Sequence, residues 1–330
     1  MRAKVLSLFS GCGGLDYGFE NHDAYEVVRA YDSDQYAVDT YNLNYPGNKA
    51  EVMDVSRLTS PDFELGFKPQ VIIGGPPCQD FSLAGNKQLG ERANMTSVYC
   101  DLICKYRPNI FVMENVTNIT SIGRVIFQEI KRRFSEHGYG LTISKINMWE
   151  YGVPQTRTRL FIIGKQGGAD DEFLKTLELA KNPVGSMREY LENHRPDVDM
   201  GGKEHVWFSP RHYRDKSTFS LDSLAPTQRT SKTPMPPTYV FNDKDSTRDM
   251  EKVYTSTYEF SSLLQTFPQS WKFPREVKIH NHRVIGNAVP PLLSKVLSNI
   301  LMKTPMRALG ESKTKLRFAI FSQKINKYTM

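Results

Sequence analysis

The segment KVLSLFSGCGGLD, residues 4–16, indicates the fold class of the chain. Its apolar first half has the length and composition of a buried strand, and Gly11, Gly13 and Gly14 follow at once. Glycines directly after a strand allow a tight turn in which the backbone comes close to a ligand, with the amino end of a helix beyond. This order is typical of the first unit of a doubly wound α/β sheet.

Further apolar runs repeat the order of strand and helix. We expect buried strands at residues 25–32, 69–75, 108–116 and 159–165, each bounded by Gly, Pro, Asn or Asp. The helices are expected in the longer segments between them, at residues 33–44, 97–105 and 122–137. Strand and helix in alternation predict a doubly wound parallel sheet.

The composition indicates a globular protein rather than a membrane protein. Hydrophobic residues make up 39% of the 330 residues, and the sequence contains no apolar run of about 18 residues or more. The N-terminus turns glycine-rich too early for a secretory signal, so we expect a cytoplasmic protein. Lys and Arg outnumber Asp and Glu by 43 to 36, giving a net charge of +7 that suits a polyanionic partner such as nucleic acid.

The alternation of strand and helix fades between about residues 166 and 255, where Pro, Ser, Thr, His and Arg become frequent. We therefore expect a large domain at residues 1–190 and 280–305, a small irregular domain at 191–279, and a basic C-terminal tail at 306–330 without an assigned role. The segment IHNHRVIGNAVPPL, residues 279–292, is expected to be a turn that introduces a last apolar helix ending at about Lys303.

Two acidic residues follow the glycine turn at positions suited to a nucleoside. Asp32 ends the next expected strand, 21 residues after Gly11, where a carboxylate can accept hydrogen bonds from ribose hydroxyls. Asp54 is placed to reach an adenine amino group. Asp16 stands where the dinucleotide fingerprint has its third glycine, so the pattern favours an adenosine-containing cofactor that is not a dinucleotide. The alternative is a plain turn and two surface aspartates.

Cys78 lies in GGPPCQDFS, residues 74–82, directly after two prolines and an expected strand. A thiolate at a strand end that faces a cleft is a candidate nucleophile, whereas a lone cysteine is more often a small buried hydrophobe. Glu114 ends another expected strand, and Arg157 and Arg159 lie two residues apart on one face of a later strand. These polar groups favour the interpretation of Cys78 as a nucleophile over that of a buried structural cysteine.

The remaining cysteines do not point to a metal. Cys100 and Cys104 have helical spacing, and no Cys or His set at zinc spacing accompanies them, so we expect core packing and no metal site.

Taken together and in this order, seven segments resemble the DNA cytosine-5 methyltransferase family. They span residues 8 to about 291, and in chain order they read LFSGCGGLD, YDSD, IIGGPPCQDFS, MENV, PQTRTR, SLLQTFPQSW and VIGNAVPP. The resemblance implies the methyltransferase version of the Rossmann sheet, with S-adenosyl-L-methionine as cofactor and a small target-recognition domain. The cofactor residues that it implies are Phe9, Gly11, Gly13, Asp32, Asp54, Pro76, Asn287 and Val289.

The resemblance also implies the chemistry. Cys78 would add to carbon 6 of a cytosine, which makes carbon 5 nucleophilic. Glu114 would meet ring nitrogen 3, Arg159 would hold the carbonyl oxygen of the base, and Arg157 would order the site or contact phosphate. No metal is required.

A cytosine stacked in a duplex is out of reach of these groups, so the base must flip out. We expect the segment after Cys78 to be a mobile loop that closes over double-stranded DNA, with Gln79 and Ser82 near the backbone. The small domain should present a basic surface with aromatic residues interleaved. Its expected members are Arg211, His212, Arg214, Lys216, Arg229 and Lys232, with Trp207, Phe208 and Tyr213.

The leading hypothesis is a sequence-specific bacterial DNA methyltransferase paired with a restriction endonuclease. A monomer would suffice, because one active site handles one flipped base. A tRNA methyltransferase is an alternative, but its Cys-Phe-Thr signature is missing, since no cysteine follows Cys104. An inactive DNA-binding regulator is another, and the presence of Cys78, Glu114, Arg157 and Arg159 together argues against it.

Overall fold

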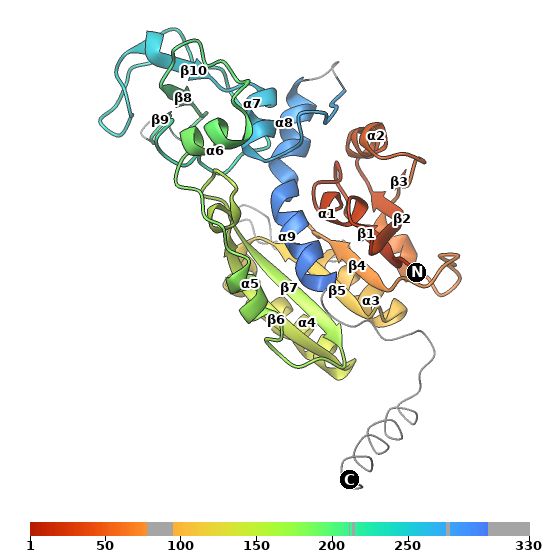
Figure 1. The fold of residues 1–330 in the computed structure, drawn as a ribbon. Coiled ribbons are helices and arrows are strands. Elements are labelled where there is room, and N and C mark those ends of the chain that lie inside the picture. Colours follow the sequence, from red (N-terminus) through yellow and green to blue (C-terminus); the bar gives the residue numbers. More distant parts are fainter. Residues whose placement is uncertain (78–94, 211, 213–214, 275–277, 303–330) are drawn as a thin grey trace, which may run out of the picture.

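The computed structural model describes residues 1–77, 95–210, 212, 215–274 and 278–302. These residues form a seven-stranded sheet and a separate three-stranded sheet (Figure 1). Along the large sheet the strands lie in the order β3 (Ala50–Val52), β2 (Tyr25–Asp32), β1 (Ala3–Leu8), β4 (Val71–Gly74), β5 (Ile110–Asn115), β7 (Thr158–Gln166) and β6 (Tyr139–Asn147).

The large sheet is mostly parallel, but β7 runs antiparallel to both of its neighbours, β5 and β6. The predicted doubly wound parallel sheet is present, with β7 as an antiparallel strand that the sequence did not predict. A parallel crossover needs about a dozen residues or more, and the connection between β6 and β7, residues 148–157, is shorter. The chain consequently turns back and pairs β7 as a hairpin partner of β6.

The expected strands are otherwise confirmed, and the two central ones are buried on both faces. All four residues of β4 and all six of β5 are buried. Strand β6 was not expected, since Ser144, Lys145 and Asn147 interrupt its apolar pattern.

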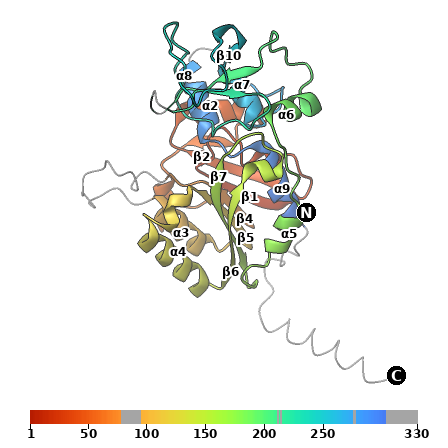
Figure 2. The same ribbon diagram turned by 90° about the vertical axis from the view of Figure 1, so that its left-hand side faces the viewer.

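Helices cover both faces of the large sheet (Figure 2). On one face lie α3 (Met95–Tyr106) and α4 (Arg124–Glu136), whose Tyr99, Ile103 and Phe134 share a hydrophobic core with Leu6 and Leu8 of β1. On the other lie α1 (Tyr17–Glu20), α5 (Leu174–Leu179) and α9 (Pro291–Met302). Near the β3 edge, α2 (Gln35–Asn44) begins after Asp34, whose side chain accepts a hydrogen bond from the Tyr36 amide.

The expected turn at 279–292 is largely helical. Helix α8 (Lys278–Asn287) occupies most of it and buries Asn281, Val284 and Ile285, which have helical spacing. Packing against α7 (Tyr258–Leu264) outweighs the weak helix propensity of its Asn and Gly residues. The stretch Lys278–Met302 has the length and composition of a membrane span, but 72% of its apolar window is buried within the protein, as in a core helix.

The three-stranded sheet has the order β10 (Val253–Thr255), β8 (His205–Trp207) and β9 (Thr218–Ser220). It shares a core with α6 (Met187–His194) and α7, built around Met187, Val206 and Phe260. The expected boundary at residue 190 falls inside α6, and the division into domains stays a prediction.

Candidate active site

A cavity of about 540 Å³ opens at the carboxyl edge of the large sheet. Because β7 is antiparallel, its first residues lie beside the carboxyl end of β5 and face the same cavity. Its volume lies within the range of about 300–1,000 Å³ that is usual for ligand pockets. The predicted site residues that line it are Phe9, Gly11, Asp32, Pro76, Glu114, Arg157, Arg159, Asn287 and Val289.

The turn after β1 forms one end of the cavity. Gly11 has φ +55°, and a Cβ placed on it would meet no atom within 4 Å, so its backbone faces open space. Its amide donates to Asp32 Oδ2 at 2.8 Å, and the Asp34 amide donates to Asp32 Oδ1 at 2.9 Å. Burial raises the pKa of Asp32, and these hydrogen bonds partly oppose the rise. The backbone thus fixes this carboxylate at the cavity wall.

These residues fit an adenosine-containing cofactor. The space in front of Gly11 admits a flat ligand against the backbone, and Asp32 offers carboxylate oxygens to ribose hydroxyls. Ser10 Oγ is buried at the cavity wall and has no hydrogen-bond partner among the described residues. Such an atom is expected where a ligand supplies the partner.

Two of the predicted cofactor residues do not line the cavity. A Cβ on Gly13 would lie 2.6 Å from the Tyr45 ring, so this glycine serves close packing against Tyr45. Asp54 is exposed and accepts a hydrogen bond from the Ser56 amide at 2.9 Å. Its hydrogen bonds to Ser56 lower the pKa of Asp54. Both assignments therefore rest on the sequence alone.

Glu114 and Arg159 form an ion pair inside the cavity. Arg159 Nε lies 3.1 Å from Glu114 Oε1, and both side chains are mostly buried. Glu114 Oε2 lies where Gly75 leaves room for it, since a Cβ on Gly75 would be 3.1 Å away. Two neighbouring strands, β5 and β7, thus place an acid and a cation side by side.

Arg157 is buried near this pair and lines the same cavity. Its side chain is 1% exposed, and Nη1 donates to the Gly286 carbonyl at 2.9 Å. Burial, with the nearby charge of Arg159, lowers the pKa of Arg157 to about 9, so it remains a cation at neutral pH. Arg157 therefore adds positive charge near Arg159 and links the residue before β7 to α8.

Cys78, Gln79 and Ser82 lie outside the described residues. Their neighbours Pro76 and Pro77 line the cavity, and the Pro76 carbonyl accepts a hydrogen bond from Asn115 Nδ2 at 3.2 Å. The chain therefore leaves the described part of the structure at the cavity wall, immediately before the predicted nucleophile.

Asp16 also lines the cavity, although the sequence did not single it out as a site residue. It is fully buried, and Tyr41 Oη donates to its Oδ1 at 3.1 Å. Burial raises the pKa of Asp16 to about 7. The sequence feature that could have identified Asp16 as a site residue is its position next to the glycine turn.

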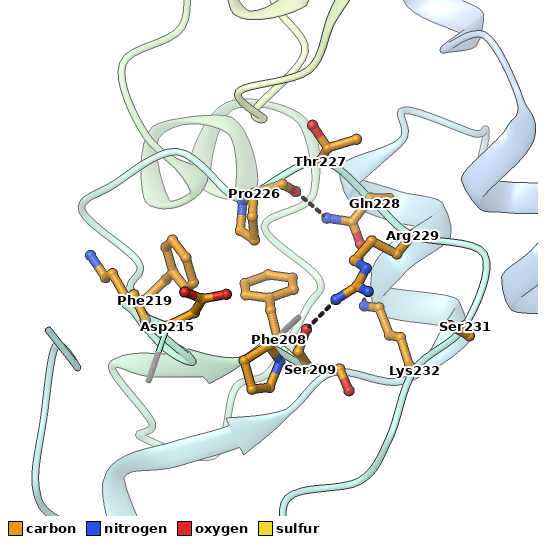
Figure 3. Close-up of a pocket in the computed structure, with 12 residues that line it drawn as sticks. Phe208, Ser209, Asp215, Phe219, Pro226, Thr227, Gln228, Arg229, Ser231 and Lys232 are labelled. Atoms are coloured by element: carbon orange, nitrogen blue, oxygen red, sulfur yellow. Dashed lines mark hydrogen bonds between the residues drawn. The ribbon is translucent and has the colours of Figure 1, made fainter. Parts of the chain in front are cut away.

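A second cavity, of about 160 Å³, lies in the small domain (Figure 3). Phe208 lies between Phe219 and Arg229 in this view, and Arg229 Nη1 donates to the Ser209 carbonyl at 3.1 Å. Arg229 is exposed, and its contact with DNA stays a prediction. Arg211 and Arg214 lie outside the described residues, as does Tyr213.

The expected basic surface of the small domain is wrong in part. Trp207 and Phe208 are core residues, 3% and 5% exposed. Lys232 Nζ points inward and donates to Gln228 Oε1, Ser256 Oγ and Ser261 Oγ. Burial lowers the pKa of Lys232 to about 7. Trp207 and Phe208 therefore belong to the core of the small domain, and the Lys232 ammonium group is engaged by side chains of the same domain.

Comparison with known proteins places the chain in a family. The family model described as C-5 cytosine-specific DNA methylase matches residues 3–303. Type II methyltransferase M.HindV of Haemophilus influenzae is 35% identical over 322 residues, covering 93% of this chain and 100% of that protein. Type II methyltransferase M.HgiDI of Herpetosiphon aurantiacus is 33% identical over 303 residues, covering 90% and 94%.

A solved structure has the same fold. The S. pombe Dnmt2 methyltransferase superposes with a TM-score of 0.69 at 21% identity, covering 92% of this chain and 99% of that one. At this identity the likeness concerns the fold alone. The family match over nearly the whole chain carries the assignment: this protein belongs to the C-5 cytosine-specific DNA methylase family and is a DNA cytosine-5 methyltransferase.

Proposed function

We propose that this enzyme transfers a methyl group from S-adenosyl-L-methionine to carbon 5 of a cytosine in a short double-stranded DNA sequence. The observation that carries the proposal is the Glu114–Arg159 pair, which shares one cavity with the glycine turn, Asp32 and the segment that leads into Cys78. A site of this kind can hold a base and a nucleoside cofactor together.

The cofactor supplies an electrophilic methyl group when it is bound. Asp32 would accept hydrogen bonds from its ribose, and Phe9 would contact its adenine. Gly11 leaves room for the ligand at the backbone. Pro76, Asn287 and Val289 would close the cavity around it. The resemblance also assigns Gly13 and Asp54 to the cofactor, although neither lines the cavity.

The base would be activated by covalent addition. The Cys78 thiolate would bond to carbon 6, and the electron pair of the 5,6 double bond would move toward carbon 5 and ring nitrogen 3. Glu114 would hydrogen-bond or protonate nitrogen 3, while Arg159 would bind the carbonyl oxygen. After carbon 5 is methylated, loss of its proton and departure of the Cys78 sulfur restore the aromatic ring.

The cytosine would reach this site only by base flipping, because none of these groups can approach a stacked base. Gln79 and Ser82 would lie near the DNA backbone beside the opened stack. Arg211, Arg214 and Arg229 of the small domain would contact the duplex, and the surplus of basic residues favours a polyanion.

The biological role would be protection of DNA from a cognate restriction endonuclease. Support comes from the relatives, which are named as type II methyltransferases. We further propose a cytoplasmic enzyme that acts as a monomer, since one cavity can process one flipped cytosine.

Bisulfite sequencing tests the proposal. Genomic DNA from a host that expresses this protein should carry methylated cytosines in one short motif, and a host that expresses Cys78→Ala should show none. Unchanged methylation in the variant would exclude Cys78 as the nucleophile. A blank result with folded wild-type protein would contradict the DNA activity and direct the search to RNA.

A further inference from the structure

Two fully buried glutamines lie between the cavity and the small domain. Gln155 and Gln265 are both 0% exposed. Gln155 stands two residues before Arg157, and the backbone around it is joined to the small domain. The Thr156 amide donates to the Ala225 carbonyl at 2.8 Å, and the Ala225 amide donates to the Pro154 carbonyl at 3.0 Å. The small domain is thereby anchored at the start of β7.

The Gln155 side chain extends this junction in two directions. Its Oε1 accepts a hydrogen bond from the backbone amide of Gln228 at 3.3 Å. Its Nε2 donates to Gln265 Oε1 at 2.7 Å and to the Leu264 carbonyl at 3.0 Å. Both N–H donors of this amide are thus used within the core.

Gln265 continues the chain of hydrogen bonds to the cavity wall. Its Nε2 donates to the Ala288 carbonyl at 2.6 Å, and Ala288 lines the cavity. The next residue, Val289, packs on the glycine turn, because its carbonyl oxygen lies 2.3 Å from where a Cβ on Gly14 would be. Three hydrogen bonds therefore connect Gln228 with the wall that faces the cofactor side.

The orientation of both amides is fixed. Turning over the Gln155 amide would bring its oxygen against Leu264 O and Gln265 Oε1 and leave the Gln228 amide facing an NH₂ group. Leaving a buried amide without a hydrogen-bond partner costs free energy, so this series of hydrogen bonds keeps one arrangement.

At its other end, this series of hydrogen bonds begins at Gln228, beside the exposed Arg229. Gln228 and Arg229 line the small-domain cavity (Figure 3). The backbone of Arg229 also touches the large domain, since a Cβ on Gly286 would lie 2.5 Å from the Arg229 carbonyl carbon. A DNA phosphate or base that moves this segment would act directly on Gln228.

We propose that Gln155, acting through Gln265, is a positioning residue that couples DNA binding by the small domain to cofactor binding in the large domain. The inference rests on the proposed function. A displacement of residues 225–229 on DNA would be carried through the two amides to Ala288 and Val289, and so to the glycine turn.

Calorimetry with S-adenosylhomocysteine measures this coupling. The protein is titrated with and without the duplex that carries the motif found by bisulfite sequencing, and the ratio of the two dissociation constants is the coupling. Couplings between sites are typically about 5–150-fold, and we expect the wild type in this range. Gln155→Met should reduce the ratio to less than about twofold, while affinity without DNA changes little.

Gln166→Met is the matched control, because Gln166 lies at the far end of β7 and its Nε2 donates to the His137 carbonyl. It should keep the wild-type ratio. Gln265→Met interrupts the chain one step later, and Gln155→Glu keeps the size of the side chain but loses the donors. At least one of these should fold with a melting temperature close to that of the control, and it should lose the coupling.

Folded Gln155 and Gln265 variants that keep the wild-type ratio would overturn the inference. So would a wild-type enzyme that methylates the duplex yet binds S-adenosylhomocysteine equally well with and without it, and that result would leave the proposed function intact. A wild-type enzyme that methylates no DNA would instead contradict the proposed function.

Discussion

The contact between Glu114 and Arg159 joins two residues that lie far apart in the chain and differ in what they can do for a bound base. Glu114 can donate or accept a proton, whereas Arg159 can only donate hydrogen bonds. Their 3.1 Å contact holds both in place before a substrate arrives. The pair is therefore preorganised, and binding a cytosine would exchange part of this contact for contacts with the ring.

Glu114→Gln should keep this geometry and lose the ionisable carboxyl group. General acid catalysis contributes about 10²–10⁴-fold to rate, so we expect single-turnover methyl transfer to slow by at least about 100-fold. DNA affinity should change far less. Glu129→Gln, on the exposed face of α4 where Glu129 pairs with Arg132, is the control and should retain full activity. Equal rates for the two variants would remove Glu114 from the chemistry.

Asp16 should make stability depend on pH. Its pKa is raised from 3.8 to about 7 by burial, so the folded protein keeps a proton that the unfolded chain loses. Its contribution to stability is therefore present below about pH 4 and is lost as pH rises to about 7. Asp16→Asn carries no charge at any pH, and its Oδ1 can still accept from Tyr41.

Relative to wild type, Asp16→Asn should gain about 2–3 kcal/mol in free energy of unfolding between pH 5 and pH 8. Urea denaturation at the two pH values measures this difference. The exposed Asp62→Asn serves as control. A difference that does not change with pH would contradict the expected titration of Asp16.

The close approach of the glycine turn to the segment between α8 and α9 shapes the cavity. A Cβ on Gly14 would lie 2.3 Å from the Val289 carbonyl oxygen, and backbone cannot yield easily. Gly14→Ala should therefore weaken S-adenosylhomocysteine binding by at least about tenfold, or about 1.4 kcal/mol, as measured by calorimetry.

Gly185→Ala is the matched control for this substitution. Its new Cβ would meet only the flexible end of Glu189, at 3.1 Å. Affinity should stay at the wild-type value in this variant. If Gly14→Ala also bound at the wild-type value, the contact with Val289 would not control the cavity.

How far the sequence predicts the elements depends on what determines each one. Buried strands such as β4 and β5 are continuous apolar runs, so their positions follow from local composition. The direction of β7 does not, because it depends on the length of the connection from a strand that was itself missed. The inward position of Lys232 depends on Ser256 and Ser261, which lie 24 and 29 residues further along the chain.

The candidate site likewise contains residues that the sequence predicted correctly and others that it did not. The resemblance to a family places Glu114, Arg159 and Asp32 in one site, and the structure brings them to one cavity. It also places Gly13 and Asp54 there, and neither lines the cavity. Gln155 and Gln265 lie in two of the segments that carry the resemblance, but their contact was not predicted, because the two amides are 110 residues apart in the chain.

At the scale of the whole molecule, a net charge of +7 should make DNA binding sensitive to salt. Each phosphate contact contributes about −0.9 to the slope of log K against log salt. The association constant of the protein with its duplex should therefore fall at least about tenfold between 50 and 200 mM salt if two or more contacts form. Fluorescence anisotropy across this range measures the slope.

Arg229→Gln should reduce the magnitude of that slope by about one, the value for one phosphate contact. Lys175→Gln, at an exposed position on α5, removes the same charge from another element and should leave the slope unchanged. Equal slopes for both variants would mean that Arg229 contributes only through the overall charge.

The packing of α1 on α9 carries a consequence for how the enzyme is made. The Gly18 amide donates to Ser294 Oγ, and Tyr25 Oη donates to the Ser298 carbonyl. The last described helix, α9, therefore packs on residues from the first part of the chain. A ribosome adds about 5–20 residues per second, so the nascent N-terminal strands wait on the order of half a minute for that helix. The face of the sheet that α9 covers therefore stays exposed during synthesis until this helix has emerged.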